Sequence, residues 1–273
     1  MDIYAEIVRL RRAGRKCAVA TIISARGSTP SYESAKLLVR EDGTTAGTIG
    51  GGCIEAQVLT SALEVMETGR PKHLGFTLSQ EAAYESGLIC GGELEVFVEP
   101  VLPQPVAFIF GAGHISKSLS KVAVVASFST VIADDRASFA NRERFPEAEE
   151  IYAGEYEEVF PKLGVNDASY VIIVTRGHKD DRRVLRLAAP GPAHYVAMIG
   201  SRKKVIEVLK DLEKEGVASD ALNRIHAPMG LDIGAVTPEE IAVSVVAEMI
   251  AVRRNAPSNW RSLSKSIHPR KAS

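Results

Sequence analysis

The chain has 273 residues, of which 45% are hydrophobic and 25% are charged, and its formal net charge is −1. This length suits two domains of ordinary size or one large one, and the nearly neutral balance excludes the basic field typical of nucleic-acid binding. No apolar run approaches the roughly 20 residues of a membrane helix, and the start of the chain does not resemble a signal peptide. We therefore expect a soluble, cytoplasmic protein that binds neither nucleic acid nor membrane.

Residues 1–104 are predicted to form a small α+β domain. An amphipathic helix is expected over 1–14, followed by a β-type run over 17–25 and turn chemistry at Gly27-Ser-Thr-Pro30. Further strands are predicted at 36–40, 71–78 and 93–98, with a hairpin turn at 41–43 and helical spacing over 54–66. Cys17 lies inside the first apolar strand and is expected to be a core residue.

A glycine loop in this domain carries a candidate site. Gly50, Gly51, Gly52 and Cys53 precede the helical pattern, and three adjacent glycines predict a loop. A helix entered from such a loop directs free N–H groups at its surroundings, which favours an anion, and a thiol there is expected to ionise more readily. The loop therefore predicts an anion or thiolate site with Cys53 as a candidate reactive group, although a tight turn with a buried thiol remains the alternative.

A second glycine-flanked cysteine, Cys90, follows in the segment Gly87-Leu-Ile-Cys90-Gly91-Gly92. Three interpretations of Cys53 and Cys90 are open: the two are ligands of one site, they form a redox pair, or they have no joint role. Neither belongs to a CxxC pair, which argues against a structural zinc site. Three cysteines in all are too few and too scattered for a disulfide framework.

A proline-rich stretch, 99–105, predicts a linker and a boundary between domains 1–104 and 105–273. Beyond it, strand and helix patterns alternate, which predicts a Rossmann-like, doubly wound parallel sheet and an overall α/β protein. Strands are expected at 106–110, 129–133, 149–152, 169–175 and 194–199. Helices are expected at 114–126, 137–144, 155–162, 179–189 and 202–215. Thr237-Pro-Glu-Glu240 is typical of a helix start and predicts a final, largely buried helix.

The first strand–helix–strand unit of this domain resembles a dinucleotide-binding fingerprint. Gly111 and Gly113, with His114, follow the first strand, and Asp134 and Asp135 follow the second. The glycines would let the backbone approach a phosphate, and a carboxylate about 20 residues later would accept from a ribose hydroxyl. The fingerprint is incomplete, because a serine stands at the position of the third glycine.

Other polar loops also follow strands of the predicted sheet. Because carboxyl ends of parallel strands share one edge, these loops are expected to converge there. Their candidate cofactor-binding residues are Arg176, His178, Ser201, Arg202 and His226. Ser201 and Arg202 start a helix and predict an anion site, with a solvated helix start as the alternative. His114 and His178 are candidate acid–base or metal-binding groups, or hydrogen-bonded loop histidines. His226 lies in a long loop that either covers the same edge or is a plain connection whose glycines set turns.

Some enzyme classes find no support in the sequence. It has no nucleophile-elbow serine, no P-loop lysine motif and no HExxH helix, which argues against hydrolase and NTPase functions.

Several segments together resemble the XdhC/CoxI family of accessory proteins for xanthine dehydrogenase and related molybdenum hydroxylases. They run in order across nearly the whole chain. In the first domain they are Gly27-Ser-Thr-Pro30, Gly47-Thr-Ile-Gly-Gly-Gly-Cys-Ile-Glu55 and Cys90-Gly-Gly92. In the second they are Gly111-Ala-Gly-His114, Asp134-Asp-Arg136, Thr175-Arg-Gly-His178, Met198-Ile-Gly-Ser-Arg-Lys203, His226-Ala-Pro-Met-Gly-Leu-Asp-Ile-Gly234 and Thr237-Pro-Glu-Glu-Ile-Ala242. The chain departs from the family pattern at Ser116, the third fingerprint position, and at Tyr32 and Ser34.

The resemblance implies a maturation factor. Such a protein binds molybdenum cofactor (molybdopterin), protects it while its terminal sulfur is installed, and assists its insertion into an apo-xanthine dehydrogenase or a related hydroxylase. It implies a cofactor-binding chaperone more than a catalyst, with a cysteine desulfurase as a further partner. Cys53 would be a candidate molybdenum contact or sulfur-handling thiol.

The residues are also compatible with two alternatives. An NAD(P)-dependent oxidoreductase would use the Rossmann domain directly, with His178 as a candidate proton donor. A nucleotide sensor without catalytic activity is the second. The Rossmann pocket would accordingly hold molybdenum cofactor, NAD(P) or another nucleotide. A homodimer is also expected if the two glycine-loop sites are completed between chains.

Overall fold

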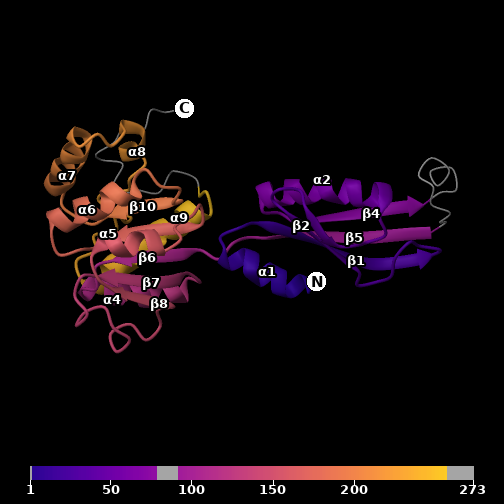
Figure 1. Cartoon of the computed structure of the whole chain (residues 1–273), viewed down its shortest axis with the longest axis horizontal. Helices are drawn as coiled ribbons and strands as arrows, with labels where there is room; N and C mark the ends of the chain where they lie inside the picture. Colours follow the sequence, from indigo (N-terminus) through magenta and orange to yellow (C-terminus); the bar gives the residue numbers. More distant parts are fainter. Residues whose placement is uncertain (1, 79–91, 257–273) are drawn as a thin grey trace. The chain divides into compact units, whose positions relative to one another are not determined.

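The computed structural model describes residues 2–78 and 92–256, and the chain divides into two compact units, residues 1–104 and 105–273 (Figure 1). Each unit is described by itself. Among the described residues, no helix is both long enough and apolar enough to cross a membrane.

Unit 1 is an antiparallel sheet with one long helix on one face. The sheet order is β3-β2-β1-β5-β4. Its strands are β1 Cys17–Gly27, β2 Lys36–Arg40, β3 Thr45–Gly47, β4 Lys72–Leu78 and β5 Gly92–Val101. Both neighbours of β1 run antiparallel to it, so the first strand of the chain is also the centre of the sheet. The predicted strands are confirmed, and β3 is an additional short edge strand.

The two helices of unit 1 cover opposite faces of this sheet. The longer, α2 Gly52–Thr68, buries Ile54, Val58, Ala62 and Val65 against inward-facing strand residues. The shorter, α1 Ile3–Arg12, packs with Leu10 against a small cluster that contains Cys17 and Leu38. Cys17 is fully buried, as predicted, and its burial raises the pKa of its thiol to about 11.

The linker between the units is shorter than the predicted stretch 99–105. The last strand of unit 1 continues to Val101, with Pro100 opposite Ala18 of β1. The partner strand β4 starts at Lys72, which lies opposite Val98 of β5. After Val98, β5 therefore has a neighbour only in β1 and is an edge strand. Proline is tolerated at an edge because no strand on the open side needs its missing N–H group. The first three residues of the proline-rich stretch, 99–101, therefore belong to β5.

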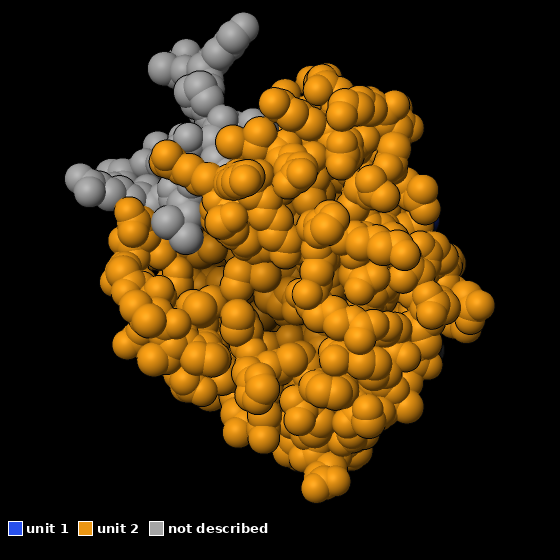
Figure 2. All heavy atoms as spheres, turned by 90° about the vertical axis from the view of Figure 1, so that its left-hand side faces the viewer, with its two compact units in different colours: residues 1–104 blue, residues 105–273 orange. Residues whose placement is uncertain are grey.

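Unit 2 is a parallel five-stranded sheet with the order β10-β9-β6-β7-β8. Its strands are β6 Val106–Phe110, β7 Ser129–Asp134, β8 Glu150–Ala153, β9 Ser169–Ile173 and β10 Tyr195–Met198. All neighbouring pairs are parallel. In chain order this is the strand arrangement 3-2-1-4-5 of a Rossmann half. The predicted Rossmann-like sheet is confirmed, and Figure 2 shows the surface of unit 2 in orange.

Helices cover both faces of this sheet, and each face has its own hydrophobic core. On one face lie α4 His114–Val125 and α9 Pro238–Arg253, which bury Leu119, Ala123, Val245 and Met249. On the other face lie α5 Tyr156–Val159, α6 His178–Ala188 and α7 Arg202–Lys214. A short helix, α8 Ser219–Asn223, adds Leu222 to that second core. Doubly wound connectivity therefore directs the helix N-termini to the carboxyl edge of the sheet.

Two predicted helices of unit 2 differ in the structure. No helix forms over 137–144, because the Asn141 side chain bonds locally: its Nδ2 donates to Ser138 O and its Oδ1 accepts from Arg144 N. The predicted helix 155–162 is only one α-helical turn, followed by a 3₁₀ turn over Phe160–Lys162, because Pro161 cannot donate to the helical ladder. By contrast, the start of α9 is confirmed as a complete capping box between Thr237 and Glu240.

The segment that contains His226 runs beside β10 as a partial sixth strand. His226 N donates to Val196 O, and Met198 N donates to His226 O, so the segment extends the sheet in parallel. Gly230 N then donates to the buried carboxylate of Glu248 on α9. The predicted covering loop is therefore tied into the sheet and to a helix.

Candidate functional site

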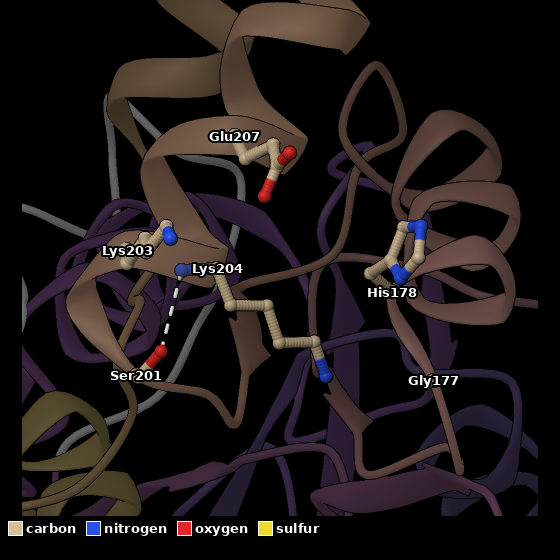
Figure 3. A pocket seen from close by; sticks show the side chains of 6 residues that line it. All are labelled: Gly177, His178, Ser201, Lys203, Lys204 and Glu207. Atoms are coloured by element: carbon tan, nitrogen blue, oxygen red, sulfur yellow. Dashed lines mark hydrogen bonds between the residues drawn. The ribbon is translucent and has the colours of Figure 1, made fainter.

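A pocket opens at the carboxyl ends of β9 and β10, between the first turns of α6 and α7 (Figure 3). It encloses about 380 Å³. Six residues line it: Gly177, His178, Ser201, Lys203, Lys204 and Glu207. Two predicted loops, the one after β9 and the one after β10, therefore meet at one site.

The local backbone turns both helix N-termini toward this pocket. Gly177 is the N-cap residue of α6 and Ser201 is that of α7, where its hydroxyl accepts from Lys204 N at 3.3 Å. The first N–H groups of each helix have no intrahelical partner, and the helix dipole adds partial positive charge there. Two such ends at one cavity favour a negatively charged ligand.

A buried carboxylate on α6 joins the two helices. Asp181 is fully buried, accepts from the Thr175 hydroxyl at 2.5 Å and forms an ion pair with Lys204 of α7. Burial raises the pKa of Asp181, and the bonds from Lys204 and Thr175 offset only part of that rise. Lys204 therefore has a structural partner, and its charge is shared between Asp181 and the pocket.

The glycine loop after β6 is arranged differently from a phosphate-binding fingerprint. Gly111 has a positive φ of 99°, and a Cβ there would stand 2.4 Å from Val174 O. The glycine is therefore required by the neighbouring strand end. Ala112 N donates to Asp134 at 2.7 Å, so this amide of the loop already has an anionic partner. Gly113, in contrast, has open space in the direction of a Cβ.

The acidic pair after β7 is engaged in ion pairs. Asp134 is buried and accepts from the Arg136 side chain at 2.8 and 2.9 Å. Burial alone would raise the pKa of Asp134, but the bonds from Arg136 and Ala112 N outweigh it and lower the pKa overall. Asp135 accepts from Arg176 at 2.7 Å, which links the loops after β7 and β9. The pKa of Asp135 is raised by its burial and by the neighbouring Asp134.

The remaining candidates of unit 2 lie in different surroundings. His114 is exposed at the first position of α4, and Arg202 is exposed at the first position of α7. His226 lies in a buried cluster, where its Nδ1 stands 3.3 Å from Glu248 and its ring packs 4.6 Å from that of Tyr195. The structure brings His178 and Ser201 together in the pocket. It pairs Asp135 with Arg176 beside β9. His226 lies apart from both, next to Glu248 and Tyr195.

The glycine loop of unit 1 also carries its own anion. Glu55 Oε1 accepts from the Thr48 hydroxyl at 2.7 Å, from Ile49 N at 3.0 Å and from Gly51 N at 3.1 Å. Burial would raise the pKa of Glu55, but these hydrogen bonds lower it overall. Gly50 has a positive φ and packs on Pro30, where a Cβ would stand 2.7 Å from the ring.

Cys53 follows this loop in the first turn of α2, where it is exposed and not in a disulfide. Cys90 lies outside the described residues. Across residues 2–78 and 92–256, no three His, Cys, Asp or Glu side chains are grouped as metal ligands.

Sequence reasoning missed Asp181, Glu207 and Glu55. Asp181 had a detectable signal, because it shares the spacing i, i+3, i+4 and i+7 with Val184, Leu185 and Ala188, the buried face of α6. A carboxylate on that face needs a partner, and Lys204 supplies it. Glu55 lacks such a signal because acidic residues in the first turn of a helix are common, and Glu207 lacks one because it is an exposed residue in the second turn of α7.

Comparison with known proteins identifies the class. Residues 107–249 match the XdhC Rossmann domain, and residues 10–77 match the XdhC and CoxI family. The chain belongs to the XdhC/CoxI family.

Three curated relatives are similar to this chain. The uncharacterized protein YqeB of Escherichia coli is 34% identical over 98% of this chain and 49% of its own length. A protein of Bacillus subtilis named as a probable xanthine dehydrogenase subunit is 27% identical over 58% of this chain and 46% of its own. The chain thus spans about half the length of these two. The molybdenum cofactor insertion chaperone PaoD of Escherichia coli is 23% identical over 88% of this chain and 85% of its own length.

A solved structure supports the fold. The crystal structure of a xanthine dehydrogenase from Bacillus halodurans matches with a TM-score of 0.53 and 23% identity, over 94% of this chain and 97% of that one. At this identity the likeness concerns the fold.

Proposed function

We propose that this chain is a maturation factor that binds molybdenum cofactor, assists its sulfuration and assists its insertion into a xanthine dehydrogenase-type molybdenum hydroxylase. The observation that carries the proposal is membership of the XdhC/CoxI family, together with similarity to a relative named as a molybdenum cofactor insertion chaperone. The chain would act as a carrier: it binds and shields the cofactor, and the client enzyme performs the catalysis.

The residues at the carboxyl edge of unit 2 fit such a ligand. The pocket volume of about 380 Å³ lies within the range of small-molecule sites. Molybdenum cofactor carries a phosphate, which suits two helix N-termini with lysines beside them. Once delivered, the cofactor supplies the redox chemistry of the client. The residues of this chain would bind the cofactor, fix its orientation and limit its contact with water.

Cys53 is the residue we propose for contact with molybdenum or for handling sulfur, with a cysteine desulfurase as the sulfur donor. Its exposure and its place after the glycine loop support this role, because a thiol must be accessible to exchange sulfur. Gly50, Gly51 and Gly52 would shape that approach, and Cys90 stays part of the hypothesis through the sequence alone.

The alternative of an NAD(P)-dependent oxidoreductase is less well supported. A fingerprint acid must be free to accept from the ribose, whereas Asp134 already accepts from Ala112 N and from Arg136. A loop that binds pyrophosphate must also offer its amides, and the Ala112 amide donates to the chain's own carboxylate.

The experiment that tests the function is co-expression with an apo-xanthine dehydrogenase. Molybdenum and pterin are measured in the purified chain, and activation of the apoenzyme is measured with and without added NAD. We expect bound pterin with molybdenum and activation that does not depend on NAD. No bound cofactor and no activation would exclude the proposal. In a parallel arm, Cys53→Ser should lower molybdenum content or client activity, and unchanged values would remove Cys53 from the mechanism.

A further inference from the structure

The sheet of unit 1 ends in a seven-residue strand that is open on one side. This strand, β4, is the last in the order β3-β2-β1-β5-β4 and pairs only with β5 (Figure 1). Every second residue of an antiparallel strand directs its N–H and C=O groups away from the paired neighbour. Among residues 2–78 and 92–256, no strand or loop backbone pairs with these outward groups of β4. We call this open side the β4 edge.

The other sheet edges of the described chain are shorter or covered. At the opposite end of the same sheet, β3 has three residues, and β8 in unit 2 has four. The outer side of β10 is covered in part by the segment that contains His226. Short edge strands, prolines and bulges are common protection against pairing with another chain. Residues 72–78 have none of these, because they are seven in number, contain no proline and pair with β5 without a register shift.

The two faces of β4 differ in polarity. On one face, three apolar side chains are half-buried and pack on the core that α2 covers: Leu74, Phe76 and Leu78. The residues that alternate with them are exposed on the other face: His73, Gly75 and Thr77. A strand that pairs with this edge must keep the alternation, since a shift of one residue would place polar side chains beside the apolar row.

The apolar row of β4 is complementary to that of a second copy. In an antiparallel pair centred on Gly75, all seven residues overlap, and each lies opposite a residue of the same face. Leu74 of each copy then lies opposite Phe76 of the other. Within one chain, Leu74 is opposite Val96 of β5 and Phe76 is opposite Leu94. The pairing therefore makes one apolar row from β5 of one copy to β5 of the other.

The charges are compatible with the same pairing. His73 of each copy lies opposite the uncharged Thr77 of the other. Lys72 stands at the end of the overlap and forms an ion pair with Glu64 of its own α2. The Glu95 carboxylates, which flank the central glycine pair, stay three strand spacings, about 14 Å, apart. Salt screens exposed charges at that separation, so no like charges oppose each other at close range.

We propose that the β4 edge pairs with the β4 edge of a second copy of this chain, antiparallel and centred on Gly75. The two sheets become one continuous sheet, and the same surface serves both copies in a twofold interface. Pairing satisfies the outward N–H and C=O groups and buries more of the apolar row. Because the twofold pair closes on itself, it leaves no free β4 edge for a third copy.

Lysines on the exposed face of β4 test the pairing. In the double variant His73→Lys, Thr77→Lys, each introduced cation lies opposite an introduced cation of the other copy, twice in the interface. Within one chain the same cations have carboxylates nearby, because His73 Nε2 stands 3.6 Å from Glu95 and Thr77 lies opposite Glu93. The variant therefore opposes the pairing while it preserves the fold.

Sedimentation equilibrium of the full chain measures the effect. We expect the unmodified chain to be a dimer, and the double lysine variant to have a dissociation constant about tenfold higher, because like charges directly opposite destabilise a strand pair. The matched control Ala5→Lys, Thr45→Lys adds cations at exposed positions of α1 and β3 and should dimerise like the unmodified chain. Circular dichroism should show the same strand and helix content for all three.

Introduced cysteines test the register independently of the lysines. A Cβ at Gly75 meets no atom within 4 Å, so Gly75→Cys fits the fold. The pairing places the two introduced thiols directly opposite each other, within reach of a disulfide. Thr77→Cys lies opposite His73 instead and should not crosslink. The unmodified chain, oxidised in the same way, gives the background from its own cysteines.

The outcomes separate a second copy from other occupants of this edge. A dimer that the double lysine variant weakens, with a crosslink at Gly75→Cys and none at Thr77→Cys, supports the proposal. A dimer that withstands the lysines and shows no crosslink uses another surface, which overturns it. A chain that is monomeric at every concentration also overturns it. If the same lysines then abolish binding of an apo-xanthine dehydrogenase, the occupant is a strand of that protein and not a second copy.

Discussion

At the scale of single residues, Gly111 and Gly113 have different structural requirements, although they belong to one motif. The backbone of Gly111 has a φ of 99°, and the end of β9 approaches it where a side chain would begin. Gly113 is the N-cap residue of α4 with a φ of −75°, which any residue adopts. The backbone position of Gly111 therefore favours glycine strongly, whereas that of Gly113 does not.

This difference predicts unequal effects of the same substitution. Gly111→Ala should reduce the free energy of unfolding by about 2 kcal/mol or more, because it adds backbone strain and a clash with Val174 O. Gly113→Ala should cost less than about 1 kcal/mol, since only the capping preference changes. Denaturant unfolding of both variants measures the difference. Equal destabilisation would show that the contact with β9 is not the cause.

The motif also shows why sequence alone does not distinguish a phosphate-binding glycine from one required by packing. A glycine after a buried strand is compatible with a ligand approaching the backbone and with a second strand approaching it. The distinction depends on where β9 ends, which is a property of strands far apart in the sequence. The role of Gly111 at a phosphate stays a prediction, and its packing against Val174 O is tertiary information that the motif does not contain.

At the scale of elements, α1 is attached to the sheet of unit 1 through Glu6. This carboxylate accepts from Arg9 on its own helix at 2.7 Å and from Arg40 at the end of β2 at 2.9 Å. The bonds from Arg9 and then Arg40 lower the pKa of Glu6 from 4.5 to about 2. Helix and strand are thereby linked by a charge that persists in mild acid.

Because the pKa of Glu6 is lowered in the folded state, its contribution is fully present above pH 4.5 and is lost as the pH falls toward 2. Glu6→Gln should therefore reduce the free energy of unfolding at neutral pH and flatten its decline over this acid range. Glu67→Gln, an exposed carboxyl on α2 without a partner among the described residues, should leave the profile unchanged. Denaturant unfolding measured as a function of pH tests this, and identical profiles for both variants would contradict it.

Elements with strong local signals were predictable from the sequence, and those decided by competing local bonds were not. The Thr237–Glu240 capping box specifies the start of α9 by itself. Residues 137–144 have a helical pattern, but Asn141 bonds to Ser138 and Arg144 and satisfies the backbone in a different way. The same residues would fit a helix if the side chain pointed to solvent, so the pattern cannot decide between the two.

At the scale of the whole molecule, each hydrophobic core belongs to one unit. Among residues 2–78 and 92–256, the two cores of unit 2 are built from residues 106 onward, and those of unit 1 from residues up to 101. Each unit therefore has the apolar burial of an independent domain. The boundary at 104 and 105 is accordingly proposed as a true domain boundary.

A fragment of residues 105–273 should fold without unit 1. We expect native-like helix content and a single cooperative thermal transition, because no side chain of its cores is removed. Circular dichroism and calorimetry measure both properties. A fragment that binds hydrophobic dyes and melts without cooperativity would show that unit 1 contributes to the folding of unit 2.

The site was predictable as a region but not in its detail. Doubly wound topology places all post-strand loops at one edge, so the meeting of His178 and Ser201 follows from the order of elements. The pairing of Lys204 with Asp181 does not follow, because it depends on the separation of two helices. Which charges at this edge are paired is therefore tertiary information.

Glu55 has a consequence for the chemistry of unit 1. Its carboxylate accepts three hydrogen bonds inside the glycine loop. Because it belongs to the same chain, it competes with any free anion for these donors at an effective concentration of about a millimolar or above. A free anion must displace this carboxylate before it reaches the amides of Ile49 and Gly51. A ligand that reaches these two amides must therefore bind them more tightly than the chain's own carboxylate does.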